Sequence, residues 1–417
     1  MSVRSLFLLC GLVLIPQGAE AASYYPELLY RYDHHLMTLN PNEFPFWRKT
    51  EEVWHYNGVE IRPDASLRTD GDSTPPLPEG VTRTLRSVWN TDAIAATIAQ
   101  RVATVIDRPR GIVSIDKNDE GNIVFDGVGF RGRTVEIVKA ATLTIAALEH
   151  SVTDIHLPVR EEQPVIHVLH PDLQDRGIAE VIAIGESNFA HSATSRRHNI
   201  ATGVHKFNGH TVPQGSVFSF NEVLGPVTGE TGYLKELVIL GDKTLPDYGG
   251  GLCQVSTTAY RGVWEYGFPI VQRRNHSFAV QYYAPQGTDA TIYPPYTDIK
   301  FLNDSPGDLL IQTHVSGDKA YFIYYGTKDK RDAEVVGPFV WDKRPPPADR
   351  VEYTSDLLPG ERKQVGKAVS GMQAAWFRIV RNGDDQEVIE PFYSYYEARP
   401  NYTQIGGQPE PPSWLGQ

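Results

Sequence analysis

The stretch GGGLCQVSTTAY, residues 249–260, decides how the centre of this chain is expected to fold. After the three glycines, apolar residues recur at every fourth position from Val255 to Val263, which predicts a helix from Cys253 to about Tyr266. A cysteine at a helix N-terminus favours the thiolate form, because unpaired N–H groups and the helix dipole stabilise negative charge there. The glycines allow close approach of a substrate, and the N–H group of Cys253 is placed to hold an oxyanion.

A thiol nucleophile needs a base, and His276 begins a segment, residues 276–283, whose alternating pattern predicts a strand. A helix that starts with a cysteine, followed by a strand that starts with a histidine, is the order of papain-like and transglutaminase-like enzymes. The alternative is structural: the glycines form a tight turn around a buried cysteine, and His276 is a half-buried histidine with satisfied hydrogen bonds. Both interpretations are open at the level of sequence.

The third member of such a catalytic site is expected on the returning strand, residues 288–293. Asp289 is the first candidate, and Asp298 is the second. Both are kept because a hairpin that turns at residues 284–287 places Asp289 several residues away from His276.

Other candidate ligand-binding residues lie in polar or glycine-rich turns of the same region. They are Arg197, Asn199, Asn221, Gly250, Gly251, Gln254 and Asn275, of which Asn275 can also help to orient the neighbouring histidine. For Arg197 and Asn221 a role in the fold is the alternative. No metal and no cofactor are expected, because structural zinc takes four ligands and this region has one cysteine. A metal site at the pair His34-His35 is not expected either, because no carboxylate stands at a fixed spacing from the two histidines that would complete such a site.

The first 21 residues have the pattern of a signal peptide. Arg4 supplies a positive start, an apolar run extends from Ser5 to Pro16, and Ala19-Glu-Ala21 is a small-x-small cleavage site. The apolar run is too short to span a bilayer, and no later run approaches about 20 apolar residues, so no transmembrane anchor is expected after cleavage. The protein is therefore expected to be secreted, or to reside in the periplasm or cell envelope.

Composition and cysteine usage narrow the class of protein further. A chain of 417 residues is expected to form two or three domains. The formal net charge of -12 argues against a nucleic-acid partner, since phosphate binding needs a basic surface. After cleavage Cys253 is the one cysteine of the chain, so an internal disulfide is excluded and its thiol either pairs with another chain or stays free.

Composition shifts and turn signals predict an α+β, multidomain protein. The expected parts are a signal peptide (1–21), an N-terminal extension and linker (22–87), a small α/β domain (88–175), a central α+β domain (178–342), a β-rich module (348–407) and a mobile tail (408–417). In the small α/β domain, helices are expected at residues 90–106, capped by Asn90 or Thr91, and at residues 134–150, with Val138 facing inward.

The motifs of the central domain resemble the VanW family, and the run GGGLCQVSTT at residues 249–258 is the most specific of them. Further matching motifs are Arg197-x-Asn199, Asn208-Gly209, Pro213-x-Gly215, Phe218-Ser-Phe-Asn221, Gly225-Pro226, Gly232-Tyr233, His276, Asp289-Ala-Thr291 and Asp298-x-Lys-Phe-x-Asn303. The resemblance covers residues 185–325. Residues 88–170 are similar to the peptidoglycan-binding domain that precedes VanW domains and some L,D-transpeptidases. Residues 351–407 are similar to the glycine-rich extracellular β-module that often follows them.

The resemblance implies a cell-envelope protein that acts on or binds peptidoglycan or its stem peptides, related to accessory proteins of glycopeptide-antibiotic (vancomycin) resistance. One hypothesis is a cysteine-dependent hydrolase or transpeptidase of cell-wall peptide bonds. In it Cys253 attacks a carbonyl, His276 acts as base and then acid, and Asp289 or Asp298 orients the imidazole. The alternative is a non-catalytic peptidoglycan-binding or cell-wall assembly factor that uses the glycine turn as part of a ligand cleft.

Overall fold

The computed structural model describes residues 25–62, 78–240, 243–383 and 386–408. The expected signal peptide (1–21), residues 22–24 and 63–77 of the expected extension and linker, and residues 409–417 of the expected tail lie outside the described residues. Within the described ranges, no helix is long and apolar enough to cross a membrane. The mixture of helices with many short sheets confirms the α+β fold class.

Contacts divide the chain into two compact units. The first comprises residues 1–30, 37–98 and 138–155, and the second comprises residues 31–36, 99–137 and 156–417. The segment 88–175, expected to be one domain, contributes to both units, whereas segments 178–342 and 348–407 both belong to the second unit.

The first unit is built around a three-stranded antiparallel sheet of order β4-β3-β5. Its elements are β3 (Arg48–Tyr56), β4 (Val59–Ile61), β5 (Val81–Trp89), the 3-10 turns η1 (Pro41–Glu43) and η2 (Pro45–Trp47), helix α1 (Thr91–Ile98) and most of α3 (Ile137–His150). The buried Trp47 anchors α1, since its indole N–H donates to the Thr97 hydroxyl at 2.9 Å. The chain passes between the units within β1 (Leu28–Tyr32), β2 (His35–Leu39) and β9 (Asp154–His156), and also after Ile98 and after Ile137.

The helix expected at residues 90–106 is confirmed as α1, one π-helical turn (Ala99–Ala103) and α2 (Thr104–Ile106). Asn90 caps it by accepting the N–H of Ala93 at 3.3 Å. The helix expected at residues 134–150 begins later, at Ile137, because Gly132–Val135 form strand β8. The inward position of Val138 is wrong, since this side chain is 75% exposed. The buried face of α3 consists instead of Ala140, Ala141, Thr144, Ala147 and Leu148.

Two small sheets open the second unit. Strands β11 (Val165–Val168), β6 (Ile112–Lys117) and β7 (Ile123–Gly127) form one sheet, in which β11 runs parallel to β6 and β7 antiparallel to it. Strands β8 (Gly132–Val135) and β10 (Val159–Glu162) form the other, and helix α4 (Pro171–Asp175) follows.

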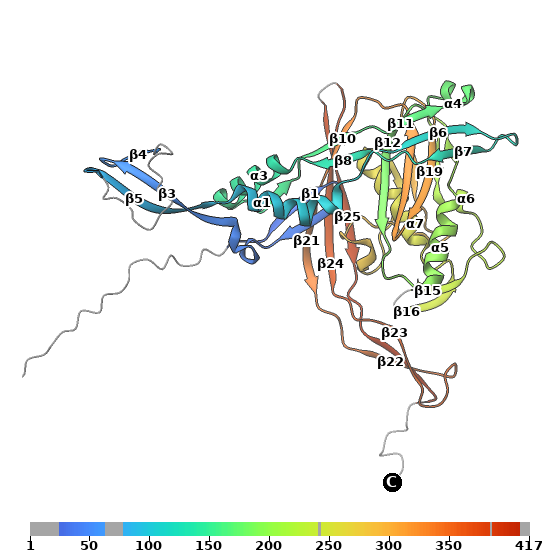
Figure 1. Cartoon of the computed structure of the whole chain (residues 1–417). Helices are drawn as coiled ribbons and strands as arrows, with labels where there is room; N and C mark the ends of the chain where they lie inside the picture. Colours follow the sequence, from blue (N-terminus) through green and yellow to red (C-terminus); the bar gives the residue numbers. More distant parts are fainter. Residues whose placement is uncertain (1–24, 63–77, 241–242, 384–385, 409–417) are drawn as a thin grey trace, which may run out of the picture. The chain divides into compact units, whose positions relative to one another are not determined.

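The core of the second unit is a four-stranded sheet packed against one long helix (Figure 1). The sheet has the order β12 (Glu180–Asn188), β20 (Lys319–Gly326), β19 (Leu309–Ser316), β13 (Thr211–Val212), and the helix is α7 (Leu252–Tyr266). A Cβ atom at Gly185 of β12 would lie 1.9 Å from the carbonyl oxygen of Thr258 in α7. The helix can therefore pack so closely on the sheet because residue 185 is a glycine. The helix predicted from residue 253 to residue 266 is confirmed.

Smaller elements surround α7 and close the core. They are α5 (Thr194–His205), α6 (Phe220–Leu224), the sheet β14 (Val217–Ser219), β18 (Lys300–Leu302), β17 (Ile270–Gln272), and the hairpin β15 (Lys235–Leu240), β16 (Lys243–Tyr248). Aromatic rings dominate the packing: Phe207 lies 4.4 Å from Phe220 and 5.3 Å from Phe322 between ring centroids. Burial of such large apolar rings is the main favourable contribution to this core.

The strands expected at residues 276–283 and 288–293 do not form. The segment consists of bends and one 3-10 turn, η5 (Gln281–Tyr283). Two guanidinium groups bind carbonyl groups that a strand ladder would have used. Arg261 donates to the carbonyl of Tyr283 at 2.8 Å, and Arg273 donates to the carbonyls of Gly287 and Asp289 at 3.0 and 2.7 Å. Tertiary hydrogen bonds thus replace the predicted hairpin.

Six strands make up the C-terminal part of the second unit. One sheet has the order β21 (Asp332–Arg344), β24 (Gly371–Arg381), β25 (Glu387–Tyr396), and the other the order β22 (Arg350–Thr354), β26 (Tyr402–Gly406), β23 (Arg362–Gly366). Trp376 of β24 packs edge-on against Trp264 of α7 at 5.5 Å, and Arg378 donates to the Trp264 carbonyl at 2.9 Å. The C-terminal strands therefore pack directly on the helix that carries Cys253.

Candidate active site

Cys253 is the second residue of α7, and the glycine turn before it determines where the thiol lies. Gly249 and Gly251 have φ angles of 79° and 113°, a left-handed region that other residues rarely adopt. A Cβ atom at Gly250 would lie 2.8 Å from the backbone of β15 at Glu236 and Leu237. The turn thus needs all three glycines. The N–H group of Cys253 belongs to the first turn of α7, where amides lack an intrahelical acceptor.

Two of the predicted ligand-binding residues hold this turn in place. Asn199 is fully buried, donates to the carbonyls of Leu234 and Gly250 at 2.9 and 3.0 Å, and accepts the Leu234 N–H at 2.8 Å. Gln254 is also fully buried, accepts from Arg196 at 3.0 Å and donates to the Asn188 carbonyl at 3.4 Å. Because their hydrogen-bonding groups are occupied inside the fold, both side chains support the cysteine turn.

His276 and Asp289 lie together, although the strands expected to carry them are absent. Nδ1 of His276 is 2.6 Å from Oδ2 of Asp289, and the same oxygen accepts the His276 backbone N–H at 2.7 Å. The ring of Tyr283 stacks on the imidazole with centroids 4.4 Å apart. Both His276 and Asp289 are at least 95% buried. The arrangement fixes the ring plane and leaves Nε2 to face another group.

That group is the thiol of Cys253. Within the described residues, Nε2 of His276 is buried and has no hydrogen-bond partner of regular geometry. The half-buried sulfur lies 3.4 Å from the Thr291 hydroxyl and 3.9 Å from the Ile292 carbonyl. Burial raises the pKa of Cys253, but hydrogen bonding and charge interaction with His276, aided by Thr291 and Ile292, lower it to about 7. The cysteine and the histidine are therefore electrostatically coupled.

The same interaction raises the pKa of His276, whereas it lowers the pKa of Cys253. Burial lowers the pKa of His276, but the hydrogen bond to Asp289 and the interaction with Cys253 raise it to about 9. Burial raises the pKa of Asp289, while hydrogen bonding to His276 and the charge of Arg273 bring it well below its usual range. These interactions therefore favour a thiolate, an imidazolium and a carboxylate over the neutral forms of the three groups.

Sequence reasoning missed two residues that hold Asp289. The Tyr396 hydroxyl at the end of β25 donates to Oδ1 of Asp289 at 2.5 Å, and Arg273 lies 3.4 Å from the same oxygen. Arg273 is three residues before His276, which is a signal that sequence could have offered. Tyr396 lies 107 residues from Asp289, and no local pattern points to it. The C-terminal strands thus complete the site around Asp289.

The remaining predicted site residues, Asp298, Arg197 and Asn275, form ion pairs or hydrogen bonds with other parts of the fold. Asp298 accepts from the Ser219 hydroxyl at 2.6 Å and from the backbone N–H of Asn221 at 2.9 Å, so it caps α6 and does not contact His276. Arg197 forms an ion pair with Asp318. Asn275 donates to the carbonyls of His276 and Tyr395, both at 2.7 Å. Asp289, not Asp298, is therefore the residue that contacts the imidazole.

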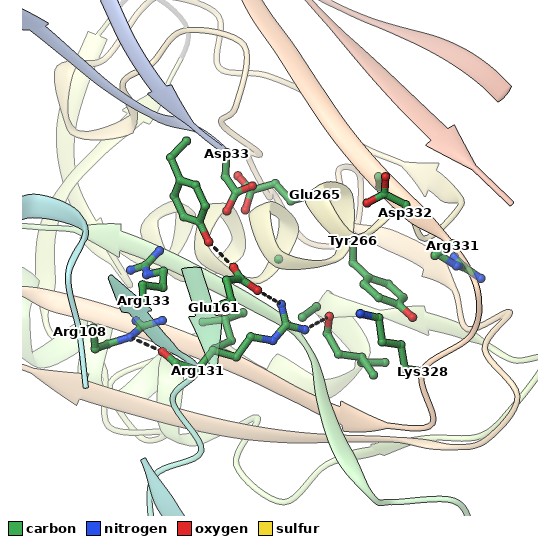
Figure 2. Close-up of a pocket in the computed structure, with 16 residues that line it drawn as sticks. Asp33, Arg108, Arg131, Arg133, Glu161, Glu265, Tyr266, Lys328, Arg331 and Asp332 are labelled. Atoms are coloured by element: carbon green, nitrogen blue, oxygen red, sulfur yellow. Dashed lines mark hydrogen bonds and ion pairs between the residues drawn. The ribbon is translucent and has the colours of Figure 1, made fainter. Parts of the chain in front are cut away.

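A second cluster of charged residues lines a cavity of about 270 Å³ (Figure 2). Figure 2 shows the carboxylates of Asp33 and Glu265 near each other, with Glu161 paired to Arg131. Cys253 is not part of this lining. No group of three metal-binding side chains occurs among the described residues.

The fold and the cluster define a protein in which a cysteine at a helix N-terminus meets a histidine held by a buried aspartate. A family model described as VanW like protein matches residues 195–325. Residues 195–325 are accordingly a VanW-like domain, which confirms the resemblance inferred from the motifs. The segments on either side lie outside this match, and their assignments stay predictions.

Two relatives each match about a third of the chain. The uncharacterized protein YoaR of Bacillus subtilis (strain 168) is 34% identical over 139 residues, which are 33% of this chain and 46% of that protein. The Vancomycin B-type resistance protein VanW of Enterococcus faecalis (strain ATCC 700802 / V583) is 26% identical over 152 residues, 35% of this chain and 50% of that protein. The chain spans about half the length of these curated relatives.

Proposed function

We propose that this protein is an exported cell-envelope enzyme that cleaves or exchanges peptide bonds in the stem peptides of peptidoglycan, with Cys253 as nucleophile. One observation carries the proposal: a cysteine at a helix N-terminus is coupled to a histidine whose Nδ1 is held by a buried carboxylate. This is the arrangement of nucleophile, base and orienting acid on which thiol acyl transfer depends.

The cell wall as substrate is supported by the relatives. One of them bears the name Vancomycin B-type resistance protein, and vancomycin resistance concerns the bacterial wall. The formal net charge of -12 argues against nucleic acid as the ligand and does not distinguish between peptide and glycan ligands. The expected signal peptide places the protein in the same compartment as the wall.

The proposed reaction has two steps. In the first, the Cys253 thiolate attacks the carbonyl carbon, a carbon–sulfur bond forms, and the N–H group of Cys253 donates to the oxyanion. The carbon–nitrogen bond then breaks as the proton on Nε2 of His276 passes to the leaving amine, which leaves a thioester. In the second step His276 takes a proton from water or from an acceptor amine as that group attacks the thioester carbonyl. The carbon–sulfur bond then breaks, which gives a carboxylic acid or a new peptide bond and returns Cys253 as the thiolate beside the imidazolium. Asp289 keeps the imidazole oriented throughout.

A second candidate function is a non-catalytic peptidoglycan-binding or wall-assembly factor. The observation that favours it is the environment of the sulfur, which is half-buried and already contacts Thr291 and Ile292. In that case the glycine turn shapes a ligand cleft and the thiol remains inert.

Mass spectrometry separates the two functions. The purified protein is incubated with muropeptides at pH 8, quenched with acid and digested. An acyl adduct on Cys253, absent from a folded Cys253→Ala variant, is the expected result, together with shortened or exchanged stem peptides. Unchanged muropeptides and an unmodified thiol, with equal muropeptide affinity in wild type and Cys253→Ala, contradict the enzyme and favour the binding factor.

A further inference from the structure

A second cavity, of about 820 Å³, lies in the second unit, and the proposed reaction does not use it. Its size falls within the range of small-molecule sites. Its lining combines residues 281–286 of the loop after His276, residues 34–36 of the N-terminal extension, residues 186–188 at the end of β12, and Arg261 of α7. Because these four separate parts of the chain contribute to the lining, the cavity is a product of the tertiary structure.

The cavity adjoins the cysteine site. Tyr282 lines it and is followed by Tyr283, the residue that stacks on His276. Asn188 also lines it, and its carbonyl accepts from the side chain of Gln254, next to Cys253. The guanidinium group of Arg196 lies 4.3 Å from the centroid of the Tyr282 ring and donates to Gln254. A ligand held here therefore lies beside the loop that carries the proposed base.

The charged groups in the lining are mostly satisfied within the protein. Glu186 is paired with His35 at 2.9 Å and with Arg133 at 3.0 Å. Arg261 donates to the carbonyls of Tyr283 and Ala284 and to the Thr288 hydroxyl. A charged ligand gains little from groups that already have partners, and separating a buried pair is costly. The lining is therefore better suited to an uncharged ligand.

Besides Lys319 and His191, the groups of the lining with unused hydrogen-bonding capacity are amides and one phenol. Among the described residues, the side chains of Gln281 and Gln286 and the hydroxyl of Tyr282 have no hydrogen-bond partner, and the Tyr282 side chain is 38% exposed. Amide groups both donate and accept hydrogen bonds, as ligand hydroxyl and acetamido groups do. An exposed aromatic ring offers a flat apolar surface with a polar edge. Sugar rings combine the same features.

We propose that this cavity, which we call the amide cavity after Asn188, Gln281 and Gln286, binds the glycan strand of the wall as an uncharged amino-sugar oligosaccharide. The inference rests on the proposed function, because that function supplies the wall as substrate. The glycan is held on the amides and on Tyr282, while an attached stem peptide extends toward Cys253. Residues 34–36 form part of the lining, which gives the N-terminal extension a role in substrate binding.

Lys319 offers an alternative ligand class for the same cavity, an acidic ligand instead of an uncharged oligosaccharide. It lines the amide cavity and has no ion pair among the described residues, so an acidic ligand would bind there. The proposal predicts that oligosaccharide affinity does not depend on this charge, and salt concentration tests the same point because screening weakens ionic contacts.

Calorimetric titration with the soluble tetramer of β-1,4-linked N-acetylglucosamine tests the proposal on the full purified protein. The double variant Gln281→Ala/Gln286→Ala is expected to bind the tetramer about tenfold more weakly, or about 1.4 kcal/mol. Gln214→Ala, an exposed glutamine elsewhere in the same unit, is the matched control. Together with Lys319→Ala it is expected to stay within about twofold of wild type. Unchanged melting temperatures establish that the variants are folded.

Three results overturn the inference: no binding of the tetramer, equal binding by the double variant, or binding that is salt-sensitive and lost in Lys319→Ala. Mass spectrometry for the acyl adduct on Cys253, carried out on the same variants, separates this inference from the proposed reaction. Acyl transfer without tetramer binding refutes the glycan site alone. Tetramer binding without any acyl adduct refutes the reaction alone.

Discussion

Two buried clusters in the second unit pair histidine with carboxylate, yet they reach opposite charge states. At the site of Cys253, Asp289 lies 2.6 Å from His276, and the pKa of that histidine rises to about 9. In the other cluster, His34 lies 2.5 Å from Glu265, and burial together with the charge of Arg261 holds the pKa of His34 well below its usual range. A carboxylate next to a histidine is therefore not sufficient to charge it.

The charge states of His276 and His34 differ because the other groups around each histidine differ. His276 faces an ionisable thiol on one side and an anionic aspartate on the other, and their combined effect exceeds the cost of burial. Burial and the adjacent His34 lower the pKa of His35, and burial raises the pKa of Glu265 to about 8. The first cluster is thus an ionised set suited to chemistry, and the pair of His34 and Glu265 is a neutral hydrogen-bonded contact.

The largest expected effect concerns Glu186, a buried carboxylate that pairs with His35, the neighbour of His34, and remains ionised. Glu186 pairs with Arg108 and Arg133 at 3.0 Å each, and all three side chains are at most 14% exposed. Glu186→Gln leaves two buried guanidinium groups without an anion, so we expect a loss of about 3 kcal/mol in the free energy of unfolding. Denaturant titration measures it.

Glu265→Gln is the matched control for that variant. Because Glu265 is protonated at pH 7, we expect its amide analogue to lose less than about 1 kcal/mol. Since the pKa of Glu265 rises from 4.5 to about 8 on folding, wild-type stability falls as pH rises through that window, and the variant lacks this slope. Equal losses in Glu186→Gln and Glu265→Gln would show that the two carboxylates are in the same charge state.

The next largest effect is on the thiol. With His276→Ala the pKa of Cys253 returns to about 9, so the thiolate fraction at pH 7 falls by about 50-fold, and alkylation by iodoacetamide slows in proportion. In wild type the rate rises as pH increases through about 7. His34→Ala serves as control and leaves the midpoint of the pH profile unchanged. An identical profile in wild type and His276→Ala would mean that the thiol and the imidazole are not coupled.

A smaller change is expected for Asp289→Asn, which keeps the side-chain shape and removes the charge. The pKa of His276 then falls, the imidazolium no longer stabilises the thiolate, and alkylation at pH 7 slows by about tenfold. The same substitution narrows the pH range in which thiolate and imidazolium coexist. Asp298→Asn, at the carboxylate that caps α6, is the control. A larger effect on alkylation at position 298 than at position 289 would reverse their assignment.

The smallest effect is expected for Tyr396→Phe. It removes the hydrogen bond to Asp289 and the one that the hydroxyl accepts from the Gly287 N–H at 2.7 Å, while Arg273 and His276 still hold the carboxylate. We expect a loss of about 1 kcal/mol in stability and a decrease of about twofold in alkylation rate at pH 7. Tyr395→Phe, on the exposed side of the same strand, should change neither. If Tyr396→Phe leaves the pH profile and the stability unaltered, the C-terminal strands do not support the site.

Sequence reasoning predicted the cysteine end of the site well and the histidine end poorly. The helix, its glycine start and the end of the helix at Gly267 follow from local pattern, because helix periodicity and left-handed turns depend on neighbours in sequence. The hairpin predicted for residues 276–293 fails because Arg261 and Arg273 bind its carbonyls. Because the hairpin is absent, the strand register that was predicted to separate Asp289 from His276 does not apply.

The sequence by itself determined that a single cysteine outside the signal-like segment stands at the start of a helix, after a glycine turn of a VanW-like domain. These properties are local, or follow from motif and composition. Only the tertiary structure decided that Asp289 and not Asp298 meets His276, and that Tyr396 joins them. The reason is physical: burial and long-range hydrogen bonds set the charge of each group, and both arise when distant segments pack together.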